Sequence, residues 1–146
     1  MKILISACLL GVRCRYDGAS KPHPLMEELA GKHTLIPVCP EQLGGLPTPR
    51  PPAERQGDRV TAVTGMDVTE QYRRGAEETL RLCRFFGCEA AVLKEKSPSC
   101  GCGSVYDGTF TGALREGEGV TAELLEVNGI PVYGESDLEA LLKVQG

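Results

Sequence analysis

The sequence predicts an α/β fold: a single three-layer domain over residues 1–146, with a mainly parallel, Rossmann-like sheet and cysteine-bearing loops at its carboxyl edge. Two observations lead to this prediction. Apolar runs of strand length alternate with amphipathic runs of helix length, which is typical of parallel sheets with right-handed crossovers. The chain is also long enough for one sizeable core, and no linker or low-complexity stretch divides it.

The first part of the chain supplies two strands and one helix. Residues 2–8 (KILISAC) and 33–41 (HTLIPVCPE) are apolar and β-branched enough for buried strands. Between them, residues 23–31 (HPLMEELAG) resemble a short helix with proline near its start. Residues 42–58 are too rich in glycine and proline for a regular element.

The middle of the chain contains the longest helical pattern. Residues 59–65 (RVTAVTG) predict a short strand. Residues 67–87 then have the spacing of a long amphipathic helix, with Gly87 as its C-terminal stop. Residues 89–96 (EAAVLKEK) are apolar at first and end in charges, which indicates a central strand that leads into a loop.

The last part of the chain also alternates between strand and helix patterns. Residues 109–119 predict an extended piece and a loop, and residues 120–129 a helix that ends in Asn-Gly. Residues 130–134 (IPVYG) follow as a strand. Residues 136–145 complete the chain as a helix, with Ser136 as its cap.

Composition excludes some classes of function. The formal charge is −4, with 25% charged and 41% hydrophobic residues, so a nucleic-acid surface built on bulk positive charge is disfavoured. No apolar run approaches the roughly 18 residues of a membrane helix, and the apolar start lacks a signal-peptide cleavage pattern. We therefore expect a cytoplasmic protein without a membrane partner, and nothing in the sequence indicates an oligomeric state.

Seven cysteines are many for a cytosolic chain of this length. Their odd number argues for metal, cluster or thiol chemistry over a disulfide framework. Cys83 and Cys88 lie within helical and strand patterns and suit buried positions. The other five fall in or beside loops that follow predicted strands, so they converge at one sheet edge; they are Cys8, Cys14, Cys39, Cys100 and Cys102.

Iron–sulfur ligation fits this pattern better than zinc. The usual structural zinc site needs Cys-x-x-Cys pairs, and none is present. Cluster thiolates can instead be gathered from separate loops. A cysteine-pair oxidoreductase is the other alternative, although the Cys100-Gly-Cys102 spacing is uncommon for it.

Polar side chains beside the thiols offer acid–base chemistry. Glu41 follows Cys39-Pro40 and either acts as a general acid or base or caps a short helix. Ser97 and Ser99 flank Pro98, where hydroxyls form turns or relay protons. The charged candidates for orienting an anionic or carbonyl-bearing ligand are Lys94, Lys96, Arg15, Arg50 and Asp17.

Three stretches together resemble a known family: residues 6–18 (SACLLGVRCRYDG), 37–54 (PVCPEQLGGLPTPRPPAE) and 93–110 (LKEKSPSCGCGSVYDGTF). They are similar to the family catalogued as domain of unknown function 523, whose characterised members are TudS-type thiouracil desulfidases. The resemblance runs through nearly the whole chain in the same order.

The resemblance implies a [4Fe–4S] cluster held by three cysteines, with one iron left open; an aerobic preparation can lose it. The implied ligands are Cys8, Cys39 and Cys100, with Cys14 as the substitute, whereas Cys102 falls where the family pattern is looser. The resemblance also implies an acid–base role for Glu41 and for one serine of the motif. Ser97 is the first choice for that serine, and Ser99 is the second.

The implied activity is a non-redox desulfidase reaction. Thiouracil and water give uracil and hydrosulfide, and the sulfur is captured on the open iron. The partner is then a small thiolated pyrimidine such as 2- or 4-thiouracil, and nucleic acid is disfavoured by the low charge. The alternatives are sulfur transfer or thionucleotide desulfuration at the same site, and a non-catalytic iron–sulfur or metal-binding module. Glu41 argues against the last, because a carrier has no use for a carboxylate beside an open iron.

Overall fold

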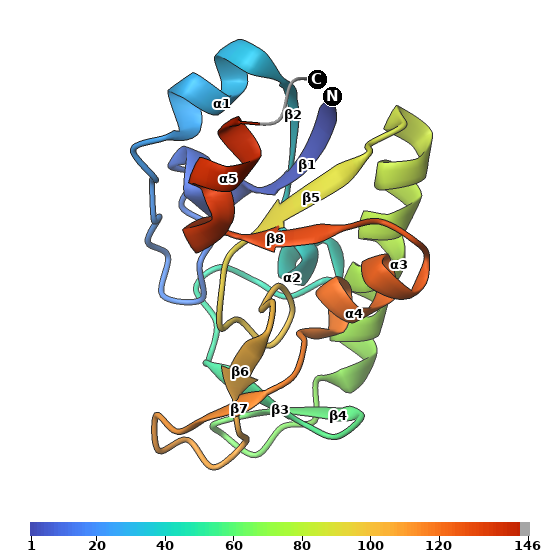
Figure 1. The fold of residues 1–146 in the computed structure, drawn as a ribbon. Coiled ribbons are helices and arrows are strands. Elements are labelled where there is room, and N and C mark those ends of the chain that lie inside the picture. Colours follow the sequence, from blue (N-terminus) through green and yellow to red (C-terminus); the bar gives the residue numbers. More distant parts are fainter. Residues whose placement is uncertain (144–146) are drawn as a thin grey trace.

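A four-stranded parallel sheet organises the molecule (Figure 1). The computed structural model describes residues 1–143. The strands lie in the order β2-β1-β5-β8, and each pairs in parallel with its neighbours. Their bounds are β1 (Lys2–Ser6), β2 (Thr34–Val38), β5 (Ala90–Leu93) and β8 (Val132–Gly134). The predicted α/β class with a parallel central sheet is confirmed.

Helices cover both faces of this sheet. One face packs against α1 (Met26–Lys32) and α5 (Leu138–Leu142), and the other against α3 (Thr69–Phe86) and α4 (Val120–Val127). The sheet is therefore the middle of three layers, as the alternation of strand and helix patterns predicts.

The side chains of β1 explain why its sequence is apolar without interruption. Ile3 and Ile5 belong to the core beneath α1 and α5, whereas Leu4 belongs to the core beneath α3 and α4. All three are fully buried. A strand that is covered on both faces needs apolar side chains at every position, and each of these contributes about 1.5–3 kcal/mol of burial free energy.

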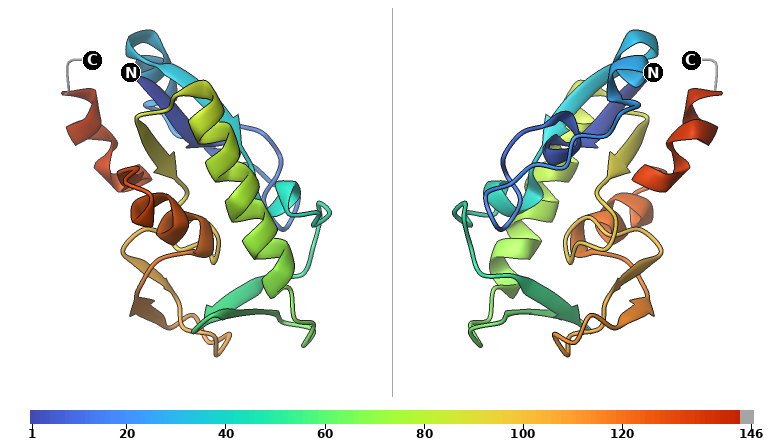
Figure 2. Two further views of the ribbon diagram at one scale, coloured as in Figure 1. Left: turned by 90° about the vertical axis from the view of Figure 1, so that its right-hand side faces the viewer. Right: turned by 90° about the vertical axis from the view of Figure 1, so that its left-hand side faces the viewer.

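Two antiparallel hairpins extend beyond the carboxyl ends of the sheet strands (Figures 1 and 2). The first pairs β3 (Ala53–Gln56) with β4 (Arg59–Ala62), and the second pairs β6 (Ser104–Tyr106) with β7 (Leu114–Glu116). They lie side by side at the end of the molecule opposite the N-terminus.

The hairpins correct part of the sequence prediction. Residues 42–58 are not free of regular structure, because β3 lies within them and pairs with β4 across a turn at Gly57. Gly57 has a φ of +60°, a conformation that glycine adopts without steric cost.

The C-terminal helix also begins differently from the prediction. A short 3-10 helix, η2 (Glu135–Asp137), precedes α5. Ser136 does not cap α5, because its hydroxyl donates to Glu95 Oε2 at 2.7 Å. Residues 144 and 145 of the predicted helix lie outside the described residues.

The long helix α3 matches its predicted pattern. Its buried face includes Tyr72, Ala76, Leu80 and Cys83, and Gly87 ends it with a φ of +67°. Its other face is charged, and no helix in the described part of the chain is both long and apolar enough to span a membrane.

Two glycines let the short helix α2 (Pro40–Leu43) lie directly against α3. A Cβ atom on Gly75 would overlap the carbonyl oxygen of Pro40, and one on Gly44 would overlap the carbonyl oxygen of Gln71. The two backbones are therefore in contact, and this contact places α2 at the carboxyl edge of the sheet.

We expect Gly75→Ala to destabilise the protein by about 1–3 kcal/mol, because the added methyl group forces the two helix backbones apart. Gly31→Ala is the matched control, since Gly31 is also helical and nothing lies within 4 Å of a Cβ built there. That control should be neutral or stabilising by up to about 1 kcal/mol. Urea unfolding measures both changes, and equal midpoints for Gly75→Ala and wild type would contradict the close-contact account.

Candidate active site

Four cysteines line one cavity of about 520 Å³ at the carboxyl edge of the sheet. Cys8 lies in the 3-10 helix η1 (Ala7–Leu10) directly after β1, and Cys14 in the loop that follows. Cys39 lies between β2 and α2, and Cys100 in the loop after β5. Parallel strands bring the loops at their ends together, so thiols that are distant in the sequence face one space.

Burial favours the protonated form of three of the cavity thiols, those of Cys8, Cys14 and Cys100. It raises the pKa of Cys8 and of Cys100, and burial together with the nearby Cys39 raises the pKa of Cys14 to about 12. A metal centre binds thiolates, so its arrival here would release these protons.

The described arrangement does not gather three cavity thiols closely enough to bind one metal ion. Two thiolates on one zinc ion lie at most about 4.6 Å apart, twice the Zn–S bond length. Within the described residues, no three of the cavity cysteines have sulfur atoms all within 4.8 Å of one another. An all-thiol donor set gathered from separate loops is suited to a cysteine-bound group such as an iron–sulfur cluster.

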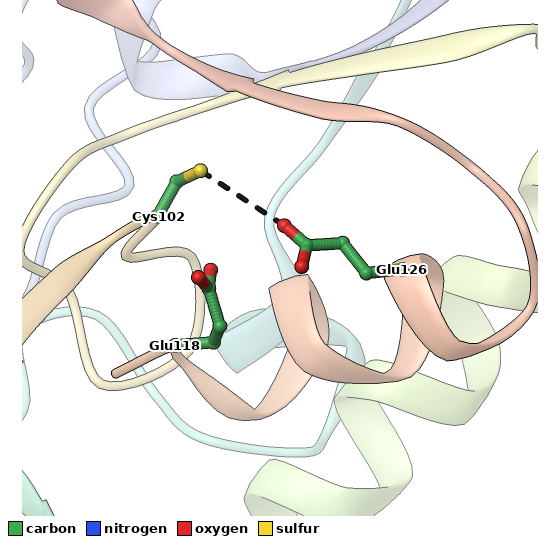
Figure 3. A group of neighbouring side chains, drawn as sticks. All are labelled: Cys102, Glu118 and Glu126. Carbon is green, nitrogen blue, oxygen red and sulfur yellow. Dashed lines mark hydrogen bonds between the residues drawn. The ribbon is translucent and has the colours of Figure 1, made fainter. Parts of the chain in front are cut away.

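Cys102 lies outside this cavity, although only one residue separates it from Cys100. Its side chain lies beside Glu118 and Glu126, and its Sγ is 4.0 Å from Glu126 Oε1 (Figure 3). Burial and these carboxylates raise the pKa of Cys102 to about 11. The thiol also contacts the carbonyl oxygen of Val132 at 3.5 Å.

Cys83 and Cys88 are also outside the cavity. Both are buried in the core between the sheet and the layer of α3 and α4. The Cys83 thiol lies 3.8 Å from the carbonyl oxygen of Cys88. These positions agree with the interpretation of both residues as buried small side chains.

Glu41 brings a carboxylate to the wall of the cavity. It lies in the first turn of α2, and its side chain is 17% exposed. Its Oε1 accepts hydrogen bonds from the Tyr72 hydroxyl and from Nε of Arg50, the latter at 3.4 Å. Glu41 is therefore held by two donors while it remains accessible from the cavity.

Arg50 ties together the segments that form the cavity wall. Its side chain is 3% exposed, and Nη2 donates to the carbonyl oxygen of Cys14 at 2.9 Å. Nη1 donates to Thr48 Oγ1 at 2.9 Å. Burial lowers the pKa of Arg50, but the Glu41 carboxylate, together with Cys39 and Tyr72, outweighs burial, so the pKa is raised. The guanidinium therefore stays charged and keeps its hydrogen bonds to neighbouring groups of the protein.

The two serines of the Ser-Pro-Ser-Cys motif lie in different surroundings. Ser97 lines the cavity, and its Oγ accepts hydrogen bonds from the backbone N–H groups of Ser99 and Cys100 at 3.1 and 3.2 Å. Ser99 is 1% exposed and does not line the cavity. Its hydroxyl is bonded to that of Thr121 at 2.8 Å. Ser97 is therefore the serine that a ligand in the cavity can reach.

The remaining charged candidates divide into paired and unpaired groups. Lys94 lines the cavity but bonds Glu135 Oε1 at 2.7 Å. Arg15 and Lys96 line it too, and neither forms an ion pair with any residue that the structure describes. Asp17 accepts a hydrogen bond from the backbone N–H of Ala19 and serves the local turn.

The sequence reasoning missed several side chains of the cavity wall, among them Ser6 and Tyr72. Ser6, the last residue of β1, accepts a hydrogen bond from the backbone N–H of Lys94 at 2.9 Å. Tyr72 comes from the buried face of α3. A tyrosine on such a face needs a partner for its hydroxyl, but the sequence does not indicate that the partner is Glu41.

Comparisons with known proteins agree with this geometry. The pattern of the 2-thiouracil desulfurase family matches residues 3–137. A Bacillus subtilis (strain 168) protein named uncharacterized protein YbbK is 41% identical in an alignment 150 residues long. The alignment covers 96% of this chain and 99% of that protein. The solved structure of a [4Fe-4S]-dependent thiouracil desulfidase, TudS, is 50% identical and superposes with a TM-score of 0.91 over 96% of this chain and 94% of its own.

The family pattern spans all four cavity cysteines and Glu41, and the structural likeness extends over nearly the whole fold. This chain belongs to the 2-thiouracil desulfurase family.

Proposed function

We propose that this protein is an iron–sulfur-dependent desulfidase that converts thiolated pyrimidines such as 2- or 4-thiouracil, with water, to uracil and hydrosulfide. The observation that carries the proposal is the convergence of thiols and the Glu41 carboxylate in one cavity. The likeness to TudS supports it. We place the reaction in the cytoplasm, where thiols stay reduced, and we expect neither nucleic acid nor a membrane as a partner.

Cys8, Cys39 and Cys100 are the proposed cluster ligands. They come from the ends of three neighbouring strands, β1, β2 and β5, so they surround the cavity from separate loops. Cys14 is the substitute ligand, because its thiol lines the same cavity. When bound, a cluster with one iron free of protein ligands supplies a Lewis acid for a soft thiocarbonyl sulfur.

The chain itself supplies the acid–base chemistry. Glu41 accepts a proton from a water molecule, whose oxygen forms a bond to the ring carbon that bears the sulfur. Ser97 lies in the same cavity with its O–H free to donate, because its oxygen accepts the two backbone hydrogen bonds. Ser97 gives its hydroxyl proton to the sulfur, onto which the π electrons of the C=S bond have moved, and the proton taken up by Glu41 replaces it. The hydroxyl proton of the adduct goes to solvent as the ring carbonyl forms. The C–S bond then breaks, the sulfur leaves as hydrosulfide, and no electrons are gained or lost.

Thionucleotide desulfuration is the second candidate function. Arg15 and Lys96 line the cavity without an acidic partner in the described part of the chain, and free cations suit a phosphorylated substrate. Sulfur transfer to an acceptor would use the same site. The kcat/KM values for a thiolated base and for its matched nucleotide separate base desulfuration from nucleotide desulfuration.

We expect Glu41→Gln to keep the visible absorption of the reconstituted protein and to lower kcat for thiouracil by about 10²–10⁴-fold, the usual contribution of a general base. The amide keeps the shape of the side chain but accepts a proton poorly. Glu89→Gln is the control, because Glu89 is exposed and far from the cavity lining. Wild-type turnover by Glu41→Gln would exclude the proposed mechanism.

Variants of the two serines should differ in kcat in the same assay. Ser97→Ala should lower kcat by about 10²-fold or more, because it removes the proton donor of the cavity, whereas Ser97→Thr keeps a hydroxyl and should recover most of the rate. Ser99→Ala loses a buried hydrogen bond and should lower the free energy of unfolding by about 1–3 kcal/mol with kcat retained. Equal kcat losses in the two alanine variants would contradict this assignment.

A further inference from the structure

The two oxygens of the Glu41 carboxylate have different surroundings. Oε1 accepts both hydrogen bonds, one from the Tyr72 hydroxyl and one from Arg50 Nε. Oε2 accepts none within the described residues. Oε2 is also accessible to solvent. Within the described residues, the only buried side-chain oxygens or nitrogens without a hydrogen-bond partner are His33 Nε2 and Glu118 Oε2, so Glu41 Oε2 is not a buried atom. One oxygen is therefore anchored, and the other has no partner in the described residues and is accessible to solvent.

Tyr72 is the tighter of the two anchors. The Arg50 Nε contact is 3.4 Å long, beyond the usual range of about 2.7–3.2 Å. The Nη atoms of Arg50 are engaged by other acceptors, the carbonyl oxygens of Cys14 and Pro47 and the Thr48 hydroxyl. The main contribution of Arg50 to Glu41 is therefore its charge, and the hydrogen bond that fixes the carboxylate comes from Tyr72.

The surroundings of Tyr72 hold its hydroxyl in place. The side chain is 2% exposed and packs against Val60 and Val68 in a small core under the first hairpin. Burial, together with the Glu41 carboxylate, raises the pKa of Tyr72. The phenol is thus a neutral donor, and it is carried by the helix that contacts α2 through Gly75.

We propose that Tyr72 is a positioning residue that holds Glu41 by Oε1, so that Oε2 is the atom that accepts the proton of the attacking water. The proposal rests on the proposed function. An O–H bond of water breaks and its proton moves to Oε2, while the water oxygen bonds to the ring carbon and the π electrons of the C=S bond move onto sulfur. A carboxylate without its anchor rotates among several orientations and is less often aligned with the water.

Tyr72→Phe tests the hydroxyl alone, because it removes the hydroxyl and keeps the ring in the small core. Tyr133→Phe is the matched control: Tyr133 is a partly buried tyrosine of β8 that packs on the opposite core and does not line the cavity. Both variants should hold the wild-type visible absorption after reconstitution, which shows that the fold and the cluster site are intact.

The test compares kcat and KM for thiouracil in wild type, Tyr72→Phe, Glu41→Gln and the double variant. Tyr72→Phe should lower kcat by about 10- to 100-fold through loss of alignment, with KM almost unchanged. In the Glu41→Gln background the same change should have almost no effect, because Tyr72 acts through Glu41. Tyr133→Phe should leave kcat unchanged in both backgrounds.

Infrared difference spectra give a second measurement that does not depend on turnover. The carboxylate band that Glu41→Gln removes should shift in Tyr72→Phe and stay in place in Tyr133→Phe, because only the former loses a hydrogen bond to Oε1. An unshifted band, or a wild-type kcat in Tyr72→Phe, would overturn the inference.

The outcomes also separate this inference from the proposed function. If Glu41→Gln is slow and Tyr72→Phe costs the same factor in both backgrounds, Tyr72 acts on the structure and not through Glu41, and only the inference fails. If Glu41→Gln turns over at the wild-type rate, the proposed mechanism fails, and the role of Tyr72 fails with it.

Discussion

The buried guanidinium of Arg50 joins the segments that carry the thiols and the carboxylate of the cavity. It donates to the carbonyl oxygen of Cys14, beyond β1, and to Glu41, beyond β2. A buried cation is stable only when its donors find partners, and removing it would leave Glu41 without its counter-charge. The wall of the cavity is therefore set by interactions within the protein, before any cofactor or substrate binds.

The parallel sheet supplies the second constraint. Three neighbouring strands end at one edge, and a cysteine lies in the loop after each of them. The backbone contact between α2 and α3, which Gly44 and Gly75 permit, adds Glu41 and Tyr72 to the same edge. The carboxylate and the thiols thus meet because of topology and one close helix contact.

The sequence could predict the features that depend on local pattern. The apolar run of β1 and the amphipathic period and terminal glycine of α3 each carry their own signal, and both elements are present. Placing the cysteine loops after strands predicted that five cysteines converge at this edge. Cys102 does not line the cavity, and the four that do are Cys8, Cys14, Cys39 and Cys100.

Features that depend on distant partners could not be predicted. The strand β3 lies in a glycine- and proline-rich stretch, and its Arg55 is buried by bonds to the Glu118 carbonyl oxygen and the Glu123 carboxylate, more than 60 residues away. Tyr72 meets Glu41 across 31 residues. The two thiols of the Cys-Gly-Cys stretch also diverge, and only Cys100 lines the cavity; the family resemblance separated these two cysteines, whereas the residue pattern by itself did not.

The most direct test of the account is the iron and sulfide content per chain after anaerobic reconstitution of single cysteine variants. Wild type and Cys102→Ser should hold about four irons, as a [4Fe–4S] cluster requires. Serine at Cys8, Cys39 or Cys100 should abolish that content, because each removes one thiolate. A full complement of iron in any of these three variants, or its loss in Cys102→Ser, would contradict the proposed site.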